Sequence, residues 1–210
     1  MNQRMITRLS KKLSWLLRHG AGEEELSMDA AGWVPVSEVL GWLRISRASL
    51  EEIVKHNDKN RLQLEDERVR CCQGHSTKTM PVTPAALEDS WQRWSGETAW
   101  HGTFVDAVGL IAREGITPQS RTHVHLTAEL HSVVGKRANV HVMLKIDCAM
   151  MRHLGHQLFV APNGVLLTRS VPAQCIVGMR PLTKRARAEL KALSASGVPG
   201  FSPAESSPAP

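Results

Sequence analysis

The ten residues SRTHVHLTAE, Ser120–Glu129, bring together side chains that could do chemistry. If the segment RTHVHLT forms a β-strand, Arg121, His123 and His125 share one face, because side chains alternate along a strand. The opposite face is apolar enough to pack on a core. A guanidinium beside two imidazoles could bind an anion or a metal ion, or could simply face solvent.

Other short segments carry further candidate groups. Arg18 and His19, in LLRHG, are predicted at a helix C-terminus. A cation there interacts favourably with the helix dipole and stabilises the helix by about 0.3–1 kcal/mol. Arg61, in NDKNRLQL, opens a predicted strand, and QGHS predicts a polar turn after the next strand. In WHGT, His101 is followed by a backbone N–H and the Thr103 hydroxyl, which could contact a ligand. Taken singly, each segment has an ordinary structural explanation.

The first ninety residues are predicted to form helices followed by a hairpin. Leucine spacing predicts an amphipathic helix over Thr7–His19, ended by the glycines of GAG. Ser37 is predicted to cap a short helix, and Ser49–Glu52 fits a capping box that opens a helix to about His56. The segments RLQL and RVRCC, separated by EDE, predict a hairpin. Helices followed by a two-stranded wing predict a winged-helix lobe, a topology common in nucleic-acid binders.

The second half is predicted to be rich in strands. Pro81, Pro84 and the polar stretch EDSWQRWSGET mark a change in composition. Strands are predicted at AWHGTF, THVHLT, VHVMLKI and GVLLT, and a helix with a glycine end at FVDAVGLIAREG. The fold class is therefore predicted as α+β. We expect lobes at residues 1–90 and 91–194, followed by a disordered Pro/Ser/Ala-rich tail at 195–210.

Composition narrows the class of protein. The 210 residues carry a formal net charge of +6, and 42% are hydrophobic, which suits one large or two small domains. No run of about 18 apolar residues could span a membrane, and the basic N-terminus lacks the apolar region of a signal peptide. The four cysteines form no CxxC pair, so a reducing cytoplasm is predicted.

The first twenty residues of the chain include several basic residues and no acidic residue. The basic residues are Arg4, Arg8, Lys11, Lys12 and Arg18. Such a patch suits a polyanion, although a solvated basic face has the same composition.

Several of these segments occur together in one order. The chain resembles the RNA 2′-phosphotransferase family, called KptA in bacteria, from about Leu9 to Leu182. The resemblance rests on LSKKLSWLLRHG, NDKNRLQL, RVRCCQGHS, WHGT, GITPQSRTHVHLT and NGVLLT, in the family's order and spacing. Independent motifs in one order are far more specific than any single motif. The resemblance implies an N-terminal winged-helix RNA-binding lobe and a C-terminal, mixed β lobe similar to ADP-ribosyltransferases.

The resemblance also implies an activity, in which NAD is consumed as a co-substrate. An internal RNA 2′-phosphate would attack the nicotinamide ribose C1″, expelling nicotinamide and leaving ADP-ribosylated RNA. The ribose 2″-OH would then attack phosphorus, releasing 2′-OH RNA and ADP-ribose 1″,2″-cyclic phosphate. The family's phosphate-handling positions fall on Arg18, His19, Arg61 and Arg121. Its NAD-binding positions fall on His101, Gly102, Thr103, His125, Arg137 and Val165.

Some positions depart from the family pattern. Lys136 replaces a frequent methionine, and Thr127 replaces a common serine but keeps its hydroxyl. Val165 is hydrophobic where many ADP-ribosyltransferases place a glutamate. The attacking phosphomonoester already carries a charge of about −1.5 to −2 at pH 7, so it needs no general base. Guanidinium groups suit the charge that builds up in the second step, and His19 suits a proton donor or a phosphate ligand.

Other classes of function stay open on the residues alone. His123 and His125 have the spacing of metal ligands, and His101 could be a third. Arg121 on the same face would repel a cation, however, and we expect no metal. A non-catalytic winged-helix nucleic-acid binder would explain the basic N-terminus but not the second lobe. Within the family, the alternative is an ADP-ribosyltransferase that acts on terminal phosphates of nucleic acids.

The expected partner is RNA that bears a 2′-phosphate, either tRNA-like, as in tRNA processing, or of another kind. We expect a cytoplasmic monomer without a membrane partner. Arg18, His19, Arg61 and Arg121 are predicted to meet at one anionic pocket between the lobes, although they come from distant segments.

Overall fold

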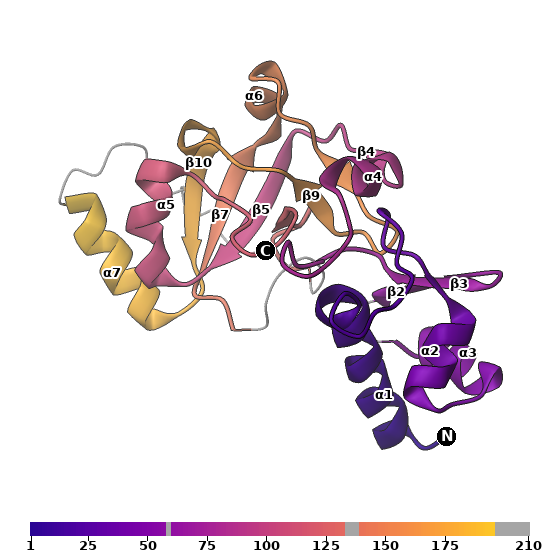
Figure 1. Ribbon diagram of the computed structural model, residues 1–210. Helices are drawn as coiled ribbons and strands as arrows, with labels where there is room; N and C mark the ends of the chain where they lie inside the picture. The colour runs from indigo at the N-terminus through magenta and orange to yellow at the C-terminus, as the bar shows by residue number, and fades with distance from the viewer. Residues whose placement is uncertain (58–59, 133–138, 196–210) are drawn as a thin grey trace. The chain divides into compact units, whose positions relative to one another are not determined.

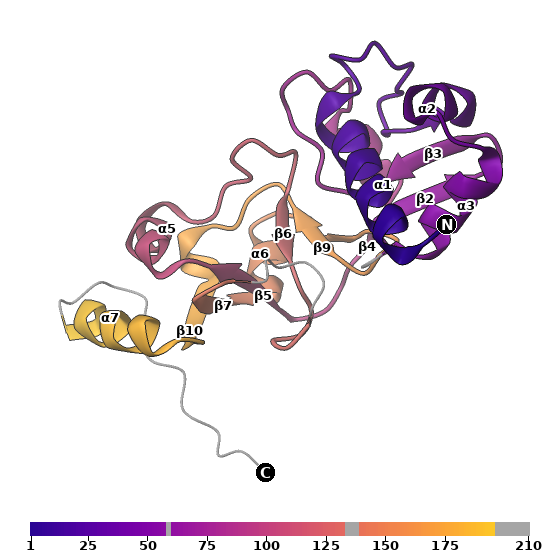
Figure 2. The ribbon, with the colours of Figure 1, turned by 90° about the horizontal axis from the view of Figure 1, so that it is seen from below.

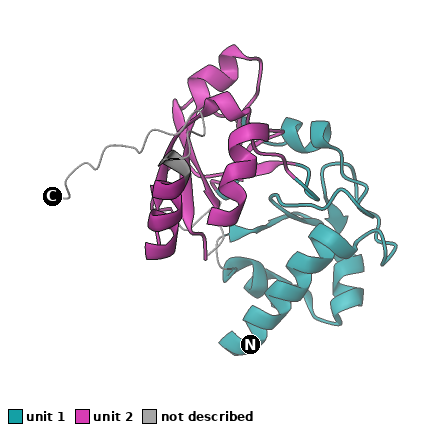
Figure 3. Ribbon diagram, turned by 90° about the vertical axis from the view of Figure 1, so that its left-hand side faces the viewer, with its two compact units in different colours: residues 1–92, 119–122, 161–163 teal, residues 93–118, 123–160, 164–210 magenta. Residues whose placement is uncertain are grey.

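The computed structural model describes residues 1–57, 60–132 and 139–195. The chain forms two compact units, which Figure 3 colours separately. The first unit comprises Met1–Gln92, Gln119–Thr122 and Ala161–Asn163, and the second comprises Arg93–Pro118, His123–Val160 and the described part of Gly164–Pro210. Two short segments therefore lie with the first unit although they come from the second half of the sequence. The predicted tail lies outside the described residues, apart from its first residue.

The first unit is rich in helices (Figure 1). They are α1 (Gln3–Trp15), the π-helical turn η1 (Leu16–Gly20), α2 (Val36–Leu43), α3 (Arg47–Lys55) and α4 (Pro84–Asp89). Along α1, Ile6, Leu9 and Leu13 recur at helical spacing and are buried. Each fully buried leucine stabilises the fold by roughly 1.5–3 kcal/mol relative to exposure. The amphipathic pattern thus predicted this helix correctly.

The predicted helix ends were less accurate than the helices. α1 begins at Gln3 rather than Thr7, because the Asn2 side chain accepts a hydrogen bond from the Met5 N–H at 2.9 Å. Ser46, not Ser49, caps α3, because Ser46 is extended and accepts from the Ser49 N–H at 3.2 Å. The predicted capping box is therefore wrong.

One more prediction near a helix start is wrong. Ser37 does not cap α2, which begins at Val36 after the extended residue Pro35. Pro84, within the predicted change in composition, is the first residue of α4, and Thr83 caps that helix. Proline is well suited to a first helical position, where its missing N–H would have no partner anyway.

The hairpin of the first unit is confirmed. Strands β2 (Leu62–Glu65) and β3 (Arg68–Cys71) pair antiparallel, and β1 (Val34–Pro35) pairs with the other edge of β3. The helices pack on this sheet through a buried apolar cluster that includes Leu13, Leu17, Val34, Leu50, Ile53 and Val69. Helices with a small antiparallel sheet fit the predicted winged helix, which stays a prediction.

The second unit is built around antiparallel sheets (Figure 2). One has the order β10-β7-β5, with β5 (Thr98–Thr103), β7 (Val142–Asp147) and β10 (Ile176–Pro181). The other has the order β4-β8-β9-β6, with β4 (Gln92–Arg93), β8 (Phe159–Val160), β9 (Leu166–Thr168) and β6 (Val124–Leu126). An isolated bridge between Trp100 and Thr127 joins the two sheets, because each residue's N–H donates to the other's carbonyl.

Short helices accompany these sheets. They are η3 (Val105–Ala107), α5 (Val108–Glu114), α6 (Cys148–His153), η4 (Ala173–Cys175) and α7 (Lys184–Ala195). The helix predicted at FVDAVGLIAREG corresponds to η3 and α5, and it ends at Gly115 with a φ of +79°. The core of this unit includes Val124, Leu126, Val142, Leu144, Ile146 and Leu166. The chain is thus a mixed α/β protein, as far as the described residues show.

The structure also shows the state of the cysteines and tests for membrane-spanning helices. All four cysteines are unpaired thiols with buried side chains. Burial raises the pKa of Cys72 to about 11, so this thiol stays protonated at neutral pH. Across the described residues, no helix has both the length and the apolar character needed to cross a bilayer.

Candidate active site

Arg18 and His19 lie in η1, the π-helical turn that directly follows α1. Such turns interrupt α-helices mainly as single turns and are frequent at functional sites. Leu16 and Leu17 in the same turn are 0% exposed and anchor it to the core. The next two residues are only half-buried, so a guanidinium and an imidazole are held at the border of the core.

The guanidinium of Arg18 is enclosed without being neutralised. Its Nε and Nη2 atoms are covered, and neither donates a hydrogen bond within the part of the chain that the structure describes. Burial raises the pKa of the neighbouring Cys71 thiol, and the Arg18 charge partly offsets this rise. Because unmet hydrogen bonds of a buried charged group are costly, these two N–H donors favour an anionic ligand.

The loop QGHS, residues 73–76, fixes Arg18 at two points. Gly74 has a φ of +89°, and a Cβ at this position would lie 3.3 Å from Cζ and Nε of Arg18. The Ser76 N–H donates to the Arg18 carbonyl oxygen at 2.9 Å. Glycine therefore serves both the backbone conformation and the close approach to the guanidinium.

The same loop holds the segment that carries Arg121. The Thr77 N–H donates to the Ser120 carbonyl at 3.0 Å, and the Thr122 N–H donates to the His75 carbonyl at 3.2 Å. Between them, Ser76 and Arg121 form an isolated antiparallel bridge. These backbone bonds place Gln119–Thr122 in the first unit, although the sequence places it between α5 and β6.

The environment of His19 shows that the cations are close to one another. Burial lowers its pKa below the ordinary value of 6.5, and the charges of Arg18 and Arg121 lower it further. An imidazole between two guanidiniums resists protonation because a third positive charge would be repelled. The pKa shift thus favours a neutral His19 at pH 7, and an anion held by these groups would oppose the shift.

Arg61 approaches the same region from the start of β2. Its N–H donates to the Asn57 side-chain oxygen at 2.6 Å, and its carbonyl accepts from the Cys72 N–H at 2.8 Å. Asn57 is 5% exposed and also donates to the Ser10 hydroxyl. The charges of Arg18 and Arg61 both lower the pKa of the Cys71 thiol, so the two guanidiniums share this neighbour.

The first unit therefore brings together the four predicted phosphate-handling residues, which we name the cation cluster. Its members are Arg18, His19, Arg61 and Arg121. Gly74 belongs to the motif RVRCCQGHS, but the sequence does not predict its contact with Arg18. Nothing in the sequence indicated Asn57, because a buried asparagine that fixes a backbone has no distinctive spacing. The chemical roles of the cluster stay predictions.

The strand predicted over residues 121–127 is wrong in its length and its faces. Regular pairing covers only β6, Val124–Leu126, whose partner is β9. Arg121 belongs to the bridge with Ser76, so it is not on the same strand as His125. His123 is 1% exposed and His125 is half-buried, so the two imidazoles do not form one exposed face.

In the second unit, β5 and β6 place the predicted NAD residues near one another. The Nδ1–H of His101 donates to the His125 carbonyl oxygen at 3.0 Å. A carbonyl can only accept, so this bond assigns the proton of the neutral ring to Nδ1 and leaves Nε2 as an acceptor. His101 and His125 are both half-buried, within reach of solvent at the junction of the two sheets.

The remaining predicted NAD residues differ in exposure. Gly102 and Thr103 end β5, opposite Met143 and Val142 of β7. Thr103 is 8% exposed. Val165, directly before β9, is 1% exposed, so its side chain packs in the core of this unit. Arg137 and the neighbouring Lys136 lie outside the described residues.

The metal-site hypothesis, which came from the spacing of the histidines, requires several ligand side chains close enough to bind one ion. Among the described residues, no group of three or more His, Cys, Asp or Glu side chains is arranged to hold a metal ion. His123 lies just before β6 and is 1% exposed, whereas His125 lies within β6 and is half-buried.

The mixed α/β chain encloses two nitrogens of the Arg18 guanidinium that have no hydrogen-bond acceptor among the described residues, and comparison with known proteins defines the family. The sequence model of the RNA 2'-phosphotransferase, Tpt1 / KptA family matches residues 4–170. This chain therefore belongs to that family, and the predicted resemblance is confirmed.

Relatives match most of the length of this chain. A probable RNA 2'-phosphotransferase of Burkholderia lata is 37% identical over 182 residues, which cover 82% of this chain and 91% of that protein. One of Rhizobium johnstonii is 37% identical over 186 residues, covering 83% and 95%. One of Streptomyces coelicolor is 33% identical over 181 residues, covering 83% and 96%.

Proposed function

We propose that this protein is an NAD-dependent RNA 2′-phosphotransferase. It removes an internal 2′-phosphate from RNA and releases nicotinamide, 2′-OH RNA and ADP-ribose 1″,2″-cyclic phosphate. Family membership supports the transferase activity and the RNA substrate. The single observation that supports the phosphate site best is the enclosed guanidinium of Arg18, whose Nε and Nη2 have no hydrogen-bond acceptor among the described residues.

The cation cluster is the proposed binding site of the 2′-phosphate. A phosphomonoester carries a charge of about −1.5 to −2 at pH 7 and offers three acceptor oxygens. Two oxygens suit the fork of N–H donors on a guanidinium, which binds phosphate in a bidentate manner. Arg121 and Arg61 add charge from two other segments of the chain. Bound phosphate would satisfy the buried donors of Arg18 and offset the repulsion around His19.

In the first proposed step, a phosphate oxygen forms a bond to C1″ of the nicotinamide ribose. The bond from C1″ to nicotinamide breaks, and nicotinamide leaves with the electron pair. The phosphate needs no general base, since it is already anionic. This agrees with a buried Val165 beside β9, where a catalytic carboxylate is not required. The cation cluster orients the nucleophile in this step.

In the second proposed step, the ribose 2″-oxygen forms a bond to phosphorus, and the bond from phosphorus to the RNA 2′-oxygen breaks. One proton must leave the 2″-hydroxyl, and one must reach the departing 2′-oxygen. His19 is the proposed proton carrier, because bound phosphate would oppose the lowering of its pKa by burial, Arg18 and Arg121 and would make it a donor next to phosphorus. The guanidiniums stabilise the added charge on the phosphoryl oxygens.

The second unit is the proposed NAD-binding site. NAD supplies the ADP-ribosyl group that accepts the phosphate. The hydrogen bond from His101 to the His125 carbonyl orients the first ring and leaves its Nε2 as an acceptor. The Nε2 acceptor and the Thr103 hydroxyl are polar groups that suit ribose hydroxyls and the N–H groups of a carboxamide. The oriented ring of His101 and the hydroxyl of Thr103 are therefore consistent with binding of NAD.

The test uses purified full-length protein with NAD and an oligonucleotide that bears one internal 2′-phosphate. The expected products are nicotinamide, the dephosphorylated oligonucleotide and ADP-ribose cyclic phosphate, identified by mass spectrometry. ADP-ribosylated RNA without transfer would instead support the alternative, a nucleic-acid ADP-ribosyltransferase. A panel with terminal 5′- and 3′-phosphates distinguishes these outcomes. Nicotinamide release from none of them would refute the proposal.

The proposed cellular setting follows from the substrate. We place the reaction in the cytoplasm, where the RNA substrate and reduced thiols such as the four buried cysteines are expected. A monomer contains every residue named for both steps. A single peak at the monomer mass with full activity, measured by light scattering, would support this assignment.

A further inference from the structure

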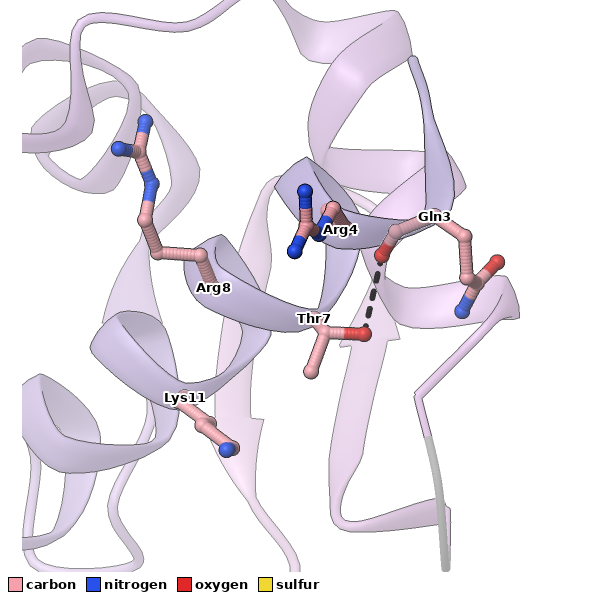
Figure 4. A pocket seen from close by; sticks show the side chains of 5 residues that line it. All are labelled: Gln3, Arg4, Thr7, Arg8 and Lys11. Atoms are coloured by element: carbon pink, nitrogen blue, oxygen red, sulfur yellow. Dashed lines mark hydrogen bonds between the residues drawn. The ribbon is translucent and has the colours of Figure 1, made fainter.

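The exposed face of α1 carries a row of basic side chains (Figure 4). Arg4, Arg8 and Lys11 follow one another at intervals of four and three residues and are all exposed. Together with Gln3 and Thr7, they line a hollow of about 440 Å³. Residues at these intervals lie on one side of a helix, and we name this row the basic stripe.

The charges of the basic stripe have no carboxylate partner. Among the described residues, none of the three forms an ion pair, and the first turn of α1 holds no acidic residue. Two other arginines do form ion pairs. Arg47 binds Glu51 and Glu67, and Arg185 binds Glu189 and Asp106. Lys12, next to the stripe, lies 4.3 Å from the centre of the Trp42 ring. The stripe is therefore left available for an external anion.

The position of the stripe is unfavourable for the helix itself. Arg4, in the first turn of α1, opposes the helix dipole at a cost of about 0.3–1 kcal/mol. Arg4 and Arg8 are also like charges at i and i+4, which repel one another by about 0.2–0.5 kcal/mol. Helix stability does not explain this arrangement, whereas binding of a polyanion does.

The opposite face of α1 narrows the choice of polyanion. Ile6, Leu9 and Leu13 on that face are buried in the first unit, so α1 has no apolar face left to enter a bilayer. The helix also continues directly into η1, which carries Arg18 and His19. At about 1.5 Å per residue, the stripe lies roughly 10–20 Å along the helix from the cation cluster. One strand rises roughly 3.4 Å per nucleotide, so this distance along the helix corresponds to a few nucleotides of RNA.

We infer that the basic stripe binds the phosphodiester backbone of the RNA substrate, a few nucleotides from the 2′-phosphate. The inference rests on the proposed function, because it takes the cation cluster as the site of the 2′-phosphate. The stripe adds a requirement for substrate length that the reaction itself does not need. A trinucleotide can fill the cation cluster alone, whereas a longer RNA also reaches α1.

The test compares two 2′-phosphorylated substrates, a trinucleotide and an oligonucleotide of about 16 nucleotides, the upper end of typical single-strand site sizes. The variant replaces Arg4, Arg8 and Lys11 with glutamine, which keeps good helix propensity. We expect KM for the long substrate to rise roughly tenfold, with an unchanged kcat. The salt slope of log KM should fall by about 2, since each lost contact to single-stranded nucleic acid contributes about 0.7. KM for the trinucleotide should not change.

The control replaces three exposed basic residues of α7, Lys184, Arg187 and Lys191, with glutamine. It removes the same formal charge from another helix, so it separates local contacts from the net charge of the protein. We expect wild-type KM values for both substrates. A control that loses affinity as much as the stripe variant would overturn the inference.

Binding of the long RNA in the absence of NAD, measured by fluorescence anisotropy, keeps the test independent of catalysis. If wild-type protein fails to turn over either substrate, the proposed function fails, but anisotropy still reports on the stripe. Unchanged RNA affinity in the stripe variant would overturn the inference. The basic stripe would then be explained as a solvated basic face without a ligand. The inference would also be overturned if the stripe variant lost affinity only for phosphatidylserine vesicles. It would be overturned as well if KM rose equally for the trinucleotide and the long substrate.

Discussion

The cation cluster of the first unit and the strand pair β5–β6 of the second unit both hold polar side chains, but they differ in charge and construction. The cluster joins η1, the start of β2 and the segment before β6, which are distant in sequence. Its groups are guanidiniums and an imidazole. The strand pair presents His101, Thr103 and His125 on neighbouring strands, with one hydrogen bond fixing the first ring.

This difference shows how each site is held in place. The strand pair depends on regular pairing within each sheet, since β5 pairs with β7 and β6 pairs with β9, and an isolated bridge between Trp100 and Thr127 joins the two sheets. The cluster depends on irregular backbone, namely a π turn, a glycine with positive φ and a two-bond junction between residues 75–77 and 120–122. Repulsion among its cations opposes this assembly, so the backbone must supply the rigidity. We therefore expect the cluster to be more sensitive to substitution than the strand pair.

The largest expected effect comes from removing a guanidinium of the cluster. Arg121→Ala should slow the second step by about 10²–10³-fold, by analogy with the loss of one oxyanion-hole donor. The first step should slow less, since the phosphate is already a nucleophile. ADP-ribosylated RNA should then accumulate as a slower band in single-turnover gels. Arg61→Ala should behave in the same way.

The matched control is Arg113→Ala, which removes an exposed arginine of α5 outside both sites. It should turn over like the wild type. The assignment would be wrong if Arg121→Ala abolished nicotinamide release while preformed intermediate was still processed at the wild-type rate. Arg121 would then dock RNA rather than stabilise charge at phosphorus.

The next largest effect should come from the loop that contacts Arg18. Gly74→Ala places a Cβ 3.3 Å from the guanidinium, at a φ of +89°. We expect turnover to fall about tenfold, because displacement of a catalytic group by about 1 Å can cost 10²-fold and this shift is smaller. Thermal unfolding should show a loss of about 1 kcal/mol from the strained backbone.

Gly41→Ala is the control for this variant. Gly41 lies inside α2 with nothing within 4 Å of an added Cβ, so alanine should stabilise the protein by about 0.5–1 kcal/mol and leave turnover unchanged. Equal turnover in Gly74→Ala and the wild type would show that the contact with Arg18 does not position the guanidinium.

The sequence predicted regular elements better than the site. Periodicity and turn residues located α1, α3, β2, β3 and β5, because each buries an apolar pattern of its own. Helix starts were missed where several polar residues compete for one cap, as Ser46 and Ser49 do. The π turn at Leu16–Gly20 was also missed, since its residues continue the leucine pattern of α1.

The members of the cation cluster came from resemblance to the family, whereas local pattern gave Arg121 the wrong neighbours. Alternation along a strand placed Arg121 with His123 and His125. Backbone bonds to residues 75–77, far away in the sequence, instead hold Arg121 in the first unit. Such long-range pairing leaves no local signal, so the geometry around Arg18 could not be derived from the sequence.

A smaller effect is expected in the second unit. Thr103→Val keeps the shape of the side chain but removes its hydroxyl, so KM for NAD should rise about 3- to 10-fold, the range of one neutral hydrogen bond. The rate of the second step from preformed intermediate should not change. Thr98→Val, at the exposed start of the same strand, is the control and should leave KM unchanged. An unchanged KM in Thr103→Val would indicate that this hydroxyl serves only the core.

The smallest expected effect is the titration of His19, which reports on the charge of the cluster directly. Burial and then the charges of Arg18 and Arg121 hold its pKa below 6.5. The unfolded chain therefore binds this proton more readily than the folded protein, so the free energy of unfolding should decrease as pH falls below 6.5. His19→Gln should flatten that pH dependence.

Adding inorganic phosphate or a 2′-phosphorylated nucleotide should raise the pKa of His19, because the bound anion favours the imidazolium. NMR titration of the imidazole signals, with and without the anion, measures this change. Arg121→Gln should raise the pKa of His19 in the anion-free protein, since one repelling charge is removed. A His19 signal that ignores both the anion and Arg121→Gln would show that the imidazole does not share a site with these charges. Proton transfer would then have to be assigned to another group.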